Sequence, residues 1–327
     1  MTGLARIAIP LLTLAALASP SRGQEAAPAP TADAPETVLG TGADQWNRMT
    51  VPVTIDGRGP YAFVVDTGAE RTVIARELAS TLGLNLGRIV TVHSMTEVQP
   101  VQTVVIGALE VGGNRVNGIH APALQRRNLG AEGMLGVDTL QSQRVSFDFK
   151  RQKMSVVPSS RLEERWPEGT IVVKGRSRFG HLVLVDAAVD GQKVWVIVDT
   201  GSAVTIGNEK LRSQLARKER LRRTAPMEMT SVTGGKLTAD QSMVRRIRIG
   251  GMKIEDMPIV FADVHPFKKL DLLDRPAILL GMDALQLFPR VSVDFANRRV
   301  RLLLPDGARR DLGTAVAGVP TRPREIS

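Results

Sequence analysis

The tripeptide Asp-Thr-Gly occurs twice in this chain, at residues 66–68 and at residues 199–201. Each copy directly follows a short apolar run, 62–65 in the first case and 196–198 in the second. An apolar run that is closed by a glycine turn predicts a buried strand ending at the aspartate. A lone Asp-Thr-Gly is expected by chance in roughly one chain of this length in ten to twenty, so one copy would mean little. Two copies in the same context predict a single site that uses both aspartates.

Three further landmarks accompany each copy in the same order. An Asp-Gly pair between apolar runs precedes the tripeptide and is a strong hairpin signal. Two apolar residues followed by Gly, x, Asp, x, Leu come later, and we expect the aspartate there to cap a short helix. The third landmark, the segment Val-Ser-x-Asp-Phe, follows. The landmarks stand at residues 56–57, 134–140 and 145–149 in the first half and at residues 190–191, 279–285 and 291–295 in the second.

The repeat is far longer than a solenoid unit, so it indicates a duplicated domain. We expect lobe one over residues 37–158, a polar linker over 159–169 and lobe two over 170–306. Short runs rich in Val and Ile, broken by Gly and turn residues, predict strands through both lobes. Brief helices are expected over 75–82 and 209–223. The sequence therefore predicts a mostly-β chain.

The N-terminal residues 1–18 have the pattern of a secretory signal peptide, with Arg6 ahead of an apolar run and Ala-Leu-Ala at its end. The run is shorter than the ~20 residues that cross a bilayer. We therefore expect an exported chain, periplasmic or secreted, with a retained membrane anchor as the alternative. Residues 19–36, rich in Ala and Pro, predict a disordered tether, and residues 307–327 a flexible tail.

Composition narrows the function classes. Of 327 residues 43% are hydrophobic, which is enough for proper cores, and there is no cysteine, which excludes disulfides and a cysteine nucleophile. The net charge is +10, and basic residues are densest over 212–223. Without a recognised binding motif or aromatic platform, this charge does not indicate nucleic-acid binding. We interpret it as a solvated helix face, with weak contact to an anionic membrane surface as the alternative.

The string Asp-Thr-Gly-Ala-Glu-Arg-Thr-Val at 66–73, together with the later apolar-apolar-Gly motif, resembles the retropepsin-like and pepsin-like aspartic peptidases. With the export signal, the chain is most similar to the bacterial retropepsin-like aspartyl peptidases, over most of residues 50–304. The resemblance implies a bilobal acid protease fold of two homologous β-barrel-like lobes with short helices. Viral members pair two chains, whereas this chain carries both tripeptides. Because a tethered partner has an effective concentration of order mM, we expect a monomer that forms the pair in cis.

The resemblance implies that Asp66 and Asp199 are the catalytic pair. Two facing carboxyls share one proton, for which the aspartic protease dyad is the standard example. The ionised member would activate a water and the protonated member would bind the carbonyl oxygen of an extended peptide substrate, without metal or organic cofactor. The expected function is that of an aspartic endopeptidase. The alternative is a non-catalytic peptide-binding module on the same fold.

Residues next to the aspartates would support the pair. The two threonines would interlock by hydroxyl-to-backbone hydrogen bonds, and the glycines would offer backbone N–H groups to the carboxylates. We also expect the Ser202 hydroxyl to donate to Asp199, which would make Asp199 the more acidic member and Asp66 the proton holder. The expected supporting set is Thr67, Gly68, Ala69, Thr200, Gly201 and Ser202.

Two hairpins, over residues 90–105 and 229–243, are expected to cover the cleft as flaps, with surface hairpins that touch no ligand as the alternative. Their expected tips are His93, Ser94, Met95 and Thr96 in lobe one and Val232, Thr233, Gly234 and Gly235 in lobe two. The chain has four histidines, at 93, 120, 181 and 265, without metal-ligand spacing. We therefore expect no metal site and assign the histidines scattered surface or core positions.

Overall fold

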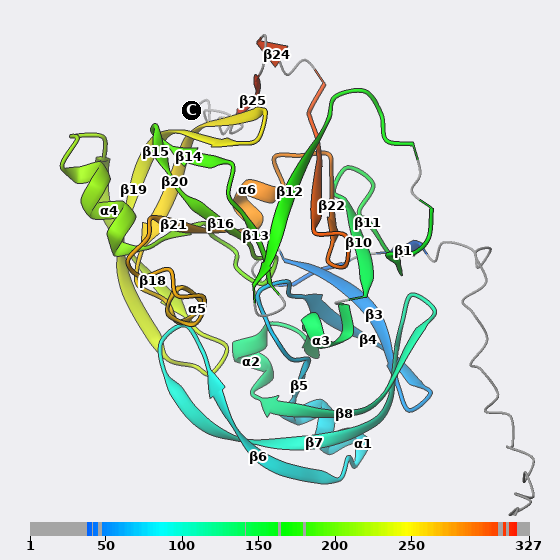
Figure 1. Ribbon diagram of the computed structural model, residues 1–327. Helices are drawn as coiled ribbons and strands as arrows, with labels where there is room; N and C mark the ends of the chain where they lie inside the picture. The colour runs from blue at the N-terminus through cyan, green and yellow to red at the C-terminus, as the bar shows by residue number, and fades with distance from the viewer. Residues whose placement is uncertain are drawn as a thin grey trace, which may run out of the picture. The chain divides into compact units, whose positions relative to one another are not determined.

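The computed structural model describes residues 38–40, 42–44, 48–140, 142–162, 165–178, 181–306, 310–311 and 314–318. The expected signal peptide and tether lie outside the described residues. The described residues are mostly β and form two sheet-rich lobes with short helices, which confirms the expected fold class (Figure 1). Within this described part, no helix combines the length and the apolar content needed to cross a membrane.

Lobe one is a closed barrel. Its strands follow the order β3-β4-β9-β5-β8-β7, and β7 pairs with β3 to close the ring. The pairs β4–β9 and β5–β8 are parallel, and the other pairs are antiparallel. The elements are β2 Gly42–Ala43, β3 Met49–Ile55, β4 Arg58–Val65, β5 Val73–Ala75, α1 Arg76–Leu82, β6 Leu86–His93, β7 Val98–Val111, β8 Asn114–Leu124, α2 Arg126–Leu129, β9 Gly133–Leu135 and α3 Val137–Leu140.

Lobe two repeats this arrangement. Strand β16 pairs in parallel with β21, as β4 does with β9, and β17 pairs in parallel with β20, as β5 does with β8. The strand equivalent to β3 is divided into β13 and β14. The elements are β13 His181–Leu184, β14 Ala187–Val189, β15 Gln192–Lys193, β16 Trp195–Val198, β17 Ile206–Gly207, α4 Glu209–Ala216, β18 Arg222–Thr230, β19 Lys236–Ile249, β20 Met252–Phe261, α5 His265–Lys269, β21 Ala277–Leu280 and α6 Met282–Leu285.

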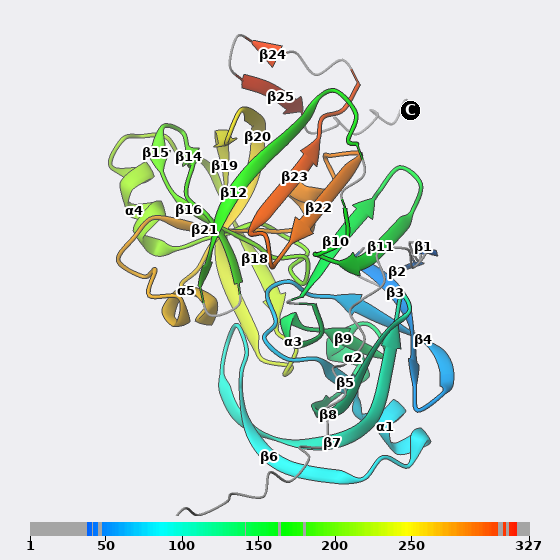
Figure 2. The same ribbon diagram turned by 45° about the vertical axis from the view of Figure 1, so that its right-hand side comes forward.

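A sheet shared by both halves joins the lobes (Figure 2). Its order is β1-β11-β10-β22-β23-β12. The two Val-Ser-x-Asp-Phe segments lie at its centre, where Ser146 is opposite Ser292 and their hydroxyl oxygens are 3.0 Å apart. An approximate two-fold axis through this serine pair therefore relates the two halves of the chain. The strands are β1 Val38–Gly40, β10 Gln143–Asp148, β11 Lys153–Pro158, β12 Thr170–Arg178, β22 Arg290–Asp294 and β23 Arg299–Leu303.

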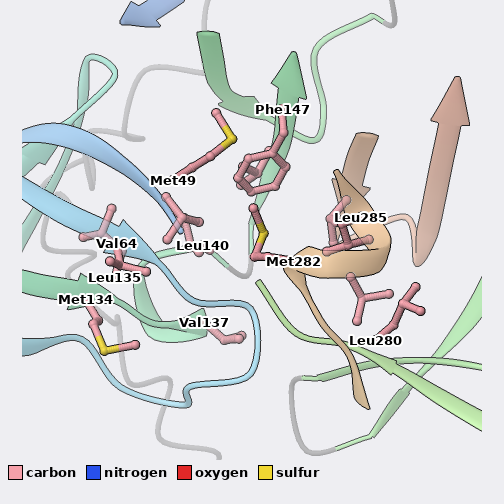
Figure 3. Close-up of a cluster of buried hydrophobic side chains, with 14 of the residues drawn as sticks. Met49, Val64, Met134, Leu135, Val137, Leu140, Phe147, Leu280, Met282 and Leu285 are labelled. Carbon is pink, nitrogen blue, oxygen red and sulfur yellow. The ribbon is translucent and has the colours of Figure 1, made fainter. Parts of the chain in front are cut away.

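One hydrophobic core runs through both halves. Leu140 and Phe147 from the first half belong to the same buried cluster as Met282 and Leu285 from the second (Figure 3). Burying apolar side chains contributes about 25 cal/mol per Å² of surface removed from water. Because the cluster is continuous across the shared sheet, burial of this surface holds the two lobes together.

The Asp-Gly turns form as the sequence predicts. Asp56 and Gly57 have φ values of 49° and 75°, and Asp190 and Gly191 have values of 45° and 75°. Two successive residues with positive φ define the type I′ turn, whose twist suits a hairpin. The Asp56 carboxylate also accepts a 2.7 Å hydrogen bond from the backbone N of Ala108, which fixes the turn against β7.

The two segments with the pattern apolar, apolar, Gly, x, Asp, x, Leu, at residues 134–140 and 279–285, are called the Leu-Gly motifs below. Their aspartates tie loops together, and the expectation that they cap helices is wrong. Asp138 accepts hydrogen bonds from the backbone N and the hydroxyl of Thr72, at 2.9 and 2.8 Å. Asp283 accepts the equivalent pair from Thr205, at 2.9 and 2.7 Å. Each aspartate therefore anchors the loop that follows an Asp-Thr-Gly turn.

The expected length of the second helix needs correction. The helix expected over 209–223 ends at Ala216, because Glu219 turns to a φ of 52° and β18 begins at Arg222. In the expected tail over 307–327, the described residues include β24 Arg310–Asp311 and β25 Thr314–Gly318. Strand β25 pairs in parallel with β20 at residues 252–255. The edge of a sheet offers unpaired N–H and C=O groups, and β25 pairs with those of β20 over these residues.

We predict that Gly136→Ala and Gly281→Ala each lower the free energy of unfolding by about 1–3 kcal/mol through overpacking. A Cβ at Gly136 would lie 2.4 Å from the carbonyl carbon of Arg71, and one at Gly281 would lie 2.4 Å from the carbonyl oxygen of Val204. The atoms that the added methyl group would meet belong to the backbone, so the backbone must move in both variants. Urea unfolding measures the effect, and Ser80→Ala on the exposed face of α1 is the control. Equal stability of all three variants would contradict the close packing.

Candidate active site

The two aspartates are brought to the middle of the molecule by equivalent strands. β4 ends at Val65 and β16 at Val198, so each aspartate follows the last residue of a buried strand. The backbone N of Asp66 donates to the carbonyl of Leu135 at 2.9 Å, and that of Asp199 donates to Leu280 at 3.0 Å. Relative exposures are 8% for Asp66 and 9% for Asp199. Both carboxyls are therefore rigidly placed and largely withdrawn from water.

Each turn orients its own carboxylate. Asp66 Oδ1 accepts hydrogen bonds from the backbone N of Gly68 and of Ala69, at 2.8 and 2.9 Å. Asp199 Oδ1 accepts from Gly201 and Ser202, at 2.9 and 3.2 Å. The two carboxyls lie close enough for the negative charge of Asp66 to raise the pKa of Asp199. Two carboxyls in this arrangement share one proton.

The glycines of the two turns are required by the close approach of the opposite aspartate. A Cβ at Gly68 would lie 2.5 Å from Asp199 Oδ1, and a Cβ at Gly201 would lie 2.2 Å from the carboxyl carbon of Asp66. No side chain fits at either position. The glycine of each lobe thus makes room for the carboxyl of the other.

Beneath the pair, two threonines interlock the lobes. Thr67 Oγ1 donates to the carbonyl of Val198 at 2.8 Å, and Thr200 Oγ1 donates to that of Val65 at 2.7 Å. Each hydroxyl also accepts from the backbone N of the other threonine, at 3.1 Å. The residues are 1% and 2% exposed. This is the hydroxyl-to-backbone interlock that the sequence led us to expect.

Burial raises the pKa values of both aspartates, and repulsion by Asp66 adds to the rise for Asp199. Burial raises the pKa of Asp66, against the lowering effects of the Gly68 N–H, of Arg48, of the Ala69 N–H and of His181. Burial and the negative charge of Asp66 raise the pKa of Asp199 to about 8. Two carboxylates this close do not both ionise at neutral pH. The pair therefore holds a single proton over a wide pH range.

The expected donation from the Ser202 hydroxyl to Asp199 is wrong. Ser202 Oγ donates instead to the carbonyl of Val204 at 2.7 Å. Only the backbone N of Ser202 reaches the carboxylate. The difference between Ala69 and Ser202 therefore does not make Asp199 the more acidic member.

The two hairpins expected as flaps meet tip to tip (Figure 1). Strands β6 and β7 are joined by residues 94–97, and β18 and β19 by residues 231–235. The Thr96 hydroxyl donates to Ser231 Oγ at 3.0 Å, and the Thr233 hydroxyl donates to Ser94 Oγ at 2.9 Å. The contact between the hairpins is therefore made by hydroxyl groups.

Two cavities lie beside the aspartates under these hairpins. The first, which we call the apolar cavity, has a volume of about 340 Å³ and is lined by both aspartates together with Met95, Met134, Val204, Met227, Met229 and Val232. The second, the charged cavity, has a volume of about 260 Å³ and is lined by Asp66 with Glu70, Arg71, His93, His181, His265 and Lys269. The space flanking the pair is therefore chemically different on its two sides.

The expected flap residues divide into two groups. His93 and Val232 line both cavities, and Ser94 and Met95 line the apolar cavity. The remaining four, Thr96, Thr233, Gly234 and Gly235, line neither cavity. A Cβ at Gly235 would lie 2.2 Å from the Thr96 hydroxyl, so glycine there permits the close contact of the tips.

Sequence reasoning missed the charged residues near the pair. Lys269 forms an ion pair with Glu70, and His181 Nε2 lies 3.9 Å from the same carboxylate. The rings of His93 and His265 stack with centroids 4.3 Å apart. Burial, His93 and Lys269 lower the pKa of His265. Three of the four histidines thus gather beside Asp66, contrary to the scattered positions expected.

A signal for one of these histidines was present in the repeat. His181 and Arg48 each stand 18 residues before their aspartate. Both are buried, and each approaches the turn of the other lobe. By contrast, His120 lines a separate cavity of about 620 Å³ with Arg71 and Arg88. Among the described residues, no group of three or more His, Asp or Glu side chains is placed to hold a metal ion.

We predict that Thr200→Val destabilises the fold by about 1–3 kcal/mol for each backbone group left unpaired. The substitution keeps the branched shape but removes the partner of the Val65 carbonyl and of the Thr67 N–H. Urea unfolding gives the free energy, Thr200→Ser should restore most of it, and Thr81→Val on the exposed side of α1 is the control. If Thr200→Val and Thr81→Val behave alike, the interlock contributes nothing to stability.

Comparison with known proteins agrees with this geometry. No curated protein is similar enough to match the chain. The family model described as aspartyl protease matches two regions, residues 51–139 and residues 185–284. Each region contains one Asp-Thr-Gly turn and all but the last residue of one Leu-Gly motif, and together they cover more than half of the chain. The chain therefore belongs to the aspartyl protease family, as a member with both lobes of the retropepsin-like fold in one polypeptide.

Proposed function

We propose that this protein is an aspartic endopeptidase in which Asp66 and Asp199 activate the water that hydrolyses a peptide bond. Family membership supports a protease-type function. The observation that carries the proposal is the pair of buried carboxyls, one from each lobe, each packed against the glycine of the opposite turn. Because both belong to one chain, a monomer supplies the whole pair.

The reaction follows from one shared proton. The ionised carboxyl takes a proton from a water held against the pair as the water oxygen attacks the peptide carbonyl carbon. The protonated carboxyl donates a hydrogen bond to the carbonyl oxygen, on which negative charge develops. A proton then passes to the peptide nitrogen, the C–N bond breaks, and the pair is left with a single proton. Catalysis thus needs both carboxyls in different ionisation states.

The flaps and cavities are suited to an extended substrate. A peptide between the lobes would add strand-like hydrogen bonds to the hairpins and place alternate side chains in the two cavities. The apolar cavity is lined by several Met and Val side chains, which suits an apolar side chain of the substrate. The hydrogen-bonded tips must separate before a chain enters, as lids over active sites commonly do.

We predict that Asp66→Asn and Asp199→Asn each reduce cleavage of a denatured protein mixture by at least about 10³-fold, because each removes one half of the acid–base pair. The assay follows new N-termini with and without a statine-type inhibitor. The matched control is Asp263→Asn. It changes a surface aspartate that lies before α5 and accepts a hydrogen bond from the backbone N of Glu209. Cleavage that survives both substitutions would remove the proposal, and peptide binding without cleavage by the wild type would favour a non-catalytic module.

The same substitutions should not unfold the protein. Asp199 keeps its proton up to about pH 8 in the folded state, whereas an unfolded aspartate loses it near pH 4. The native state is therefore penalised as pH rises from roughly 4 towards 8, and Asp199→Asn removes this penalty. At pH 8 we expect Asp199→Asn to be at least as stable as wild type, which thermal unfolding can check.

We predict a bell-shaped dependence of kcat/KM on pH. Activity should be lost as pH rises through about 8, where Asp199 gives up the shared proton. It should also be lost in acid, where Asp66 becomes protonated, at a pH above the ordinary aspartate value because burial raises the pKa of Asp66. Initial rates on one fluorogenic peptide from pH 3 to 10 test this. Activity that is constant from pH 6 to 10 would contradict a shared proton.

A further inference from the structure

Arg48 lies next to the pair and contacts both lobes. It stands immediately before β3 and is 4% exposed. Its Nη1 donates to the carbonyl oxygen of Gly201 at 3.1 Å, and its Nη2 donates to the carbonyl oxygen of Leu129. Its Nε donates to Asp44 Oδ2 at 2.7 Å. The guanidinium is thus held in one place, in the lining of the apolar cavity.

The bond to Gly201 reaches the turn that orients Asp199. The carbonyl of Gly201 and the N–H of Ser202 belong to one planar peptide group. That N–H donates to Asp199 Oδ1 at 3.2 Å. By fixing the carbonyl end of the peptide, Arg48 also fixes the direction of the N–H at its other end.

The equivalent position in lobe two is His181. Thr50 pairs with Val64 in lobe one, and Val183 pairs with Ile197 in lobe two, so Arg48 and His181 occupy the same place in the repeat. His181 Nδ1 lies 3.4 Å from the carbonyl oxygen of Thr67. A permanent cation therefore stands at one of two equivalent positions and a titratable imidazole at the other. The approximate two-fold symmetry of the turns does not extend to their charges.

The surrounding charges act unequally on the two aspartates. Arg48 and His181 both lower the pKa of Asp66. The charge that acts on Asp199 is the negative charge of Asp66, which raises its pKa. The buried carboxylate of Asp44 offsets part of the charge of Arg48, and Lys269 is paired with Glu70. The other charged or titratable groups that line the two cavities are Arg71, His93, Glu228 and His265.

We propose that Arg48 is a positioning residue that makes Asp66 the ionised member of the pair and Asp199 the proton holder. Its guanidinium stabilises negative charge on Asp66 and holds the peptide that orients Asp199. This assignment is the reverse of the one expected from Ser202. The effect on ionisation rests on the position of Arg48, which is bonded to Gly201, the residue against which the Asp66 carboxyl packs. The effect on catalysis rests also on the proposed endopeptidase activity.

The kinetic test compares Arg48→Gln, Arg48→Lys and the control Arg127→Gln, which removes an exposed arginine of α2. Removing a cation makes each proton of the pair harder to lose, so Arg48→Gln should move the acid limb of the kcat/KM profile, set by Asp66, to higher pH by about one unit and the alkaline limb, set by Asp199, by less. Arg48→Lys keeps the charge but not the fork of donors, so its profile should stay in place while kcat falls. Arg127→Gln should change neither. A uniform loss of activity without a shift in Arg48→Gln would overturn the proposal.

A second measurement needs no turnover. Carboxyl carbon NMR follows the titration of Asp66 in an Asp199→Asn background and that of Asp199 in an Asp66→Asn background. Adding Arg48→Gln should raise the pKa of Asp66 by about one unit and that of Asp199 by less. Equal or absent shifts would overturn the proposal even if the protein cleaves peptides. If the wild type cleaves nothing, the proposed function fails while this titration still decides the role of Arg48.

Arg48→Gln leaves the buried Asp44 without its guanidinium, and this can prevent folding. The double variant Arg48→Gln with Asp44→Asn removes both charges and allows the two amides to hydrogen-bond. In this variant the pKa of Asp66 should also rise, but by less than in Arg48→Gln alone, because the opposing charge of Asp44 is lost as well. A downward shift in this variant would contradict the assignment.

Discussion

The close approach of two Asp-Thr-Gly turns is the constraint on which the rest of the structure depends. Each glycine leaves space that the carboxyl of the opposite lobe fills, and each threonine bonds to the backbone of the opposite turn. These contacts leave little freedom for the lobes to slide against each other. The pKa values of the aspartates follow directly, because the approach that excludes water also brings two like charges together.

The shared sheet and the common core make this approach stable. The serine pair at the centre of β10 and β22 lies on the approximate two-fold axis, so the shared sheet joins the two halves at equivalent positions. The aspartates of the Leu-Gly motifs then fix the loops that follow each turn. Rigid placement of the carboxyls is therefore a property of the whole duplicated fold. The asymmetric charges of Arg48, His181, Glu70 and Lys269 are superimposed on that frame.

Most features that repeat in the sequence were predictable, apart from the role of Asp138 and Asp283, whereas several features that occur once were not. The two tripeptides, the Asp-Gly turns and the hairpin positions follow from local patterns that have the same meaning in both halves. The end of α4 and the pairing of β25 depend on neighbours that are distant in sequence, so local propensity does not determine them. The Ser202 prediction failed because a hydroxyl can rotate to a backbone carbonyl two residues away. The charged cavity could not be assembled from sequence because Glu70 and Lys269 come from different lobes.

The contacts between the two halves of the chain also have a consequence for biosynthesis. Asp66 gains its counterpart only after residues 196–201 have folded against it, and the shared sheet is complete only when β22 and β23 are present. Domains of a nascent chain fold in order from the N-terminus. A ribosome-bound first lobe therefore carries a single unpaired acid, and hydrolytic capacity would arise only once nearly the entire polypeptide has emerged.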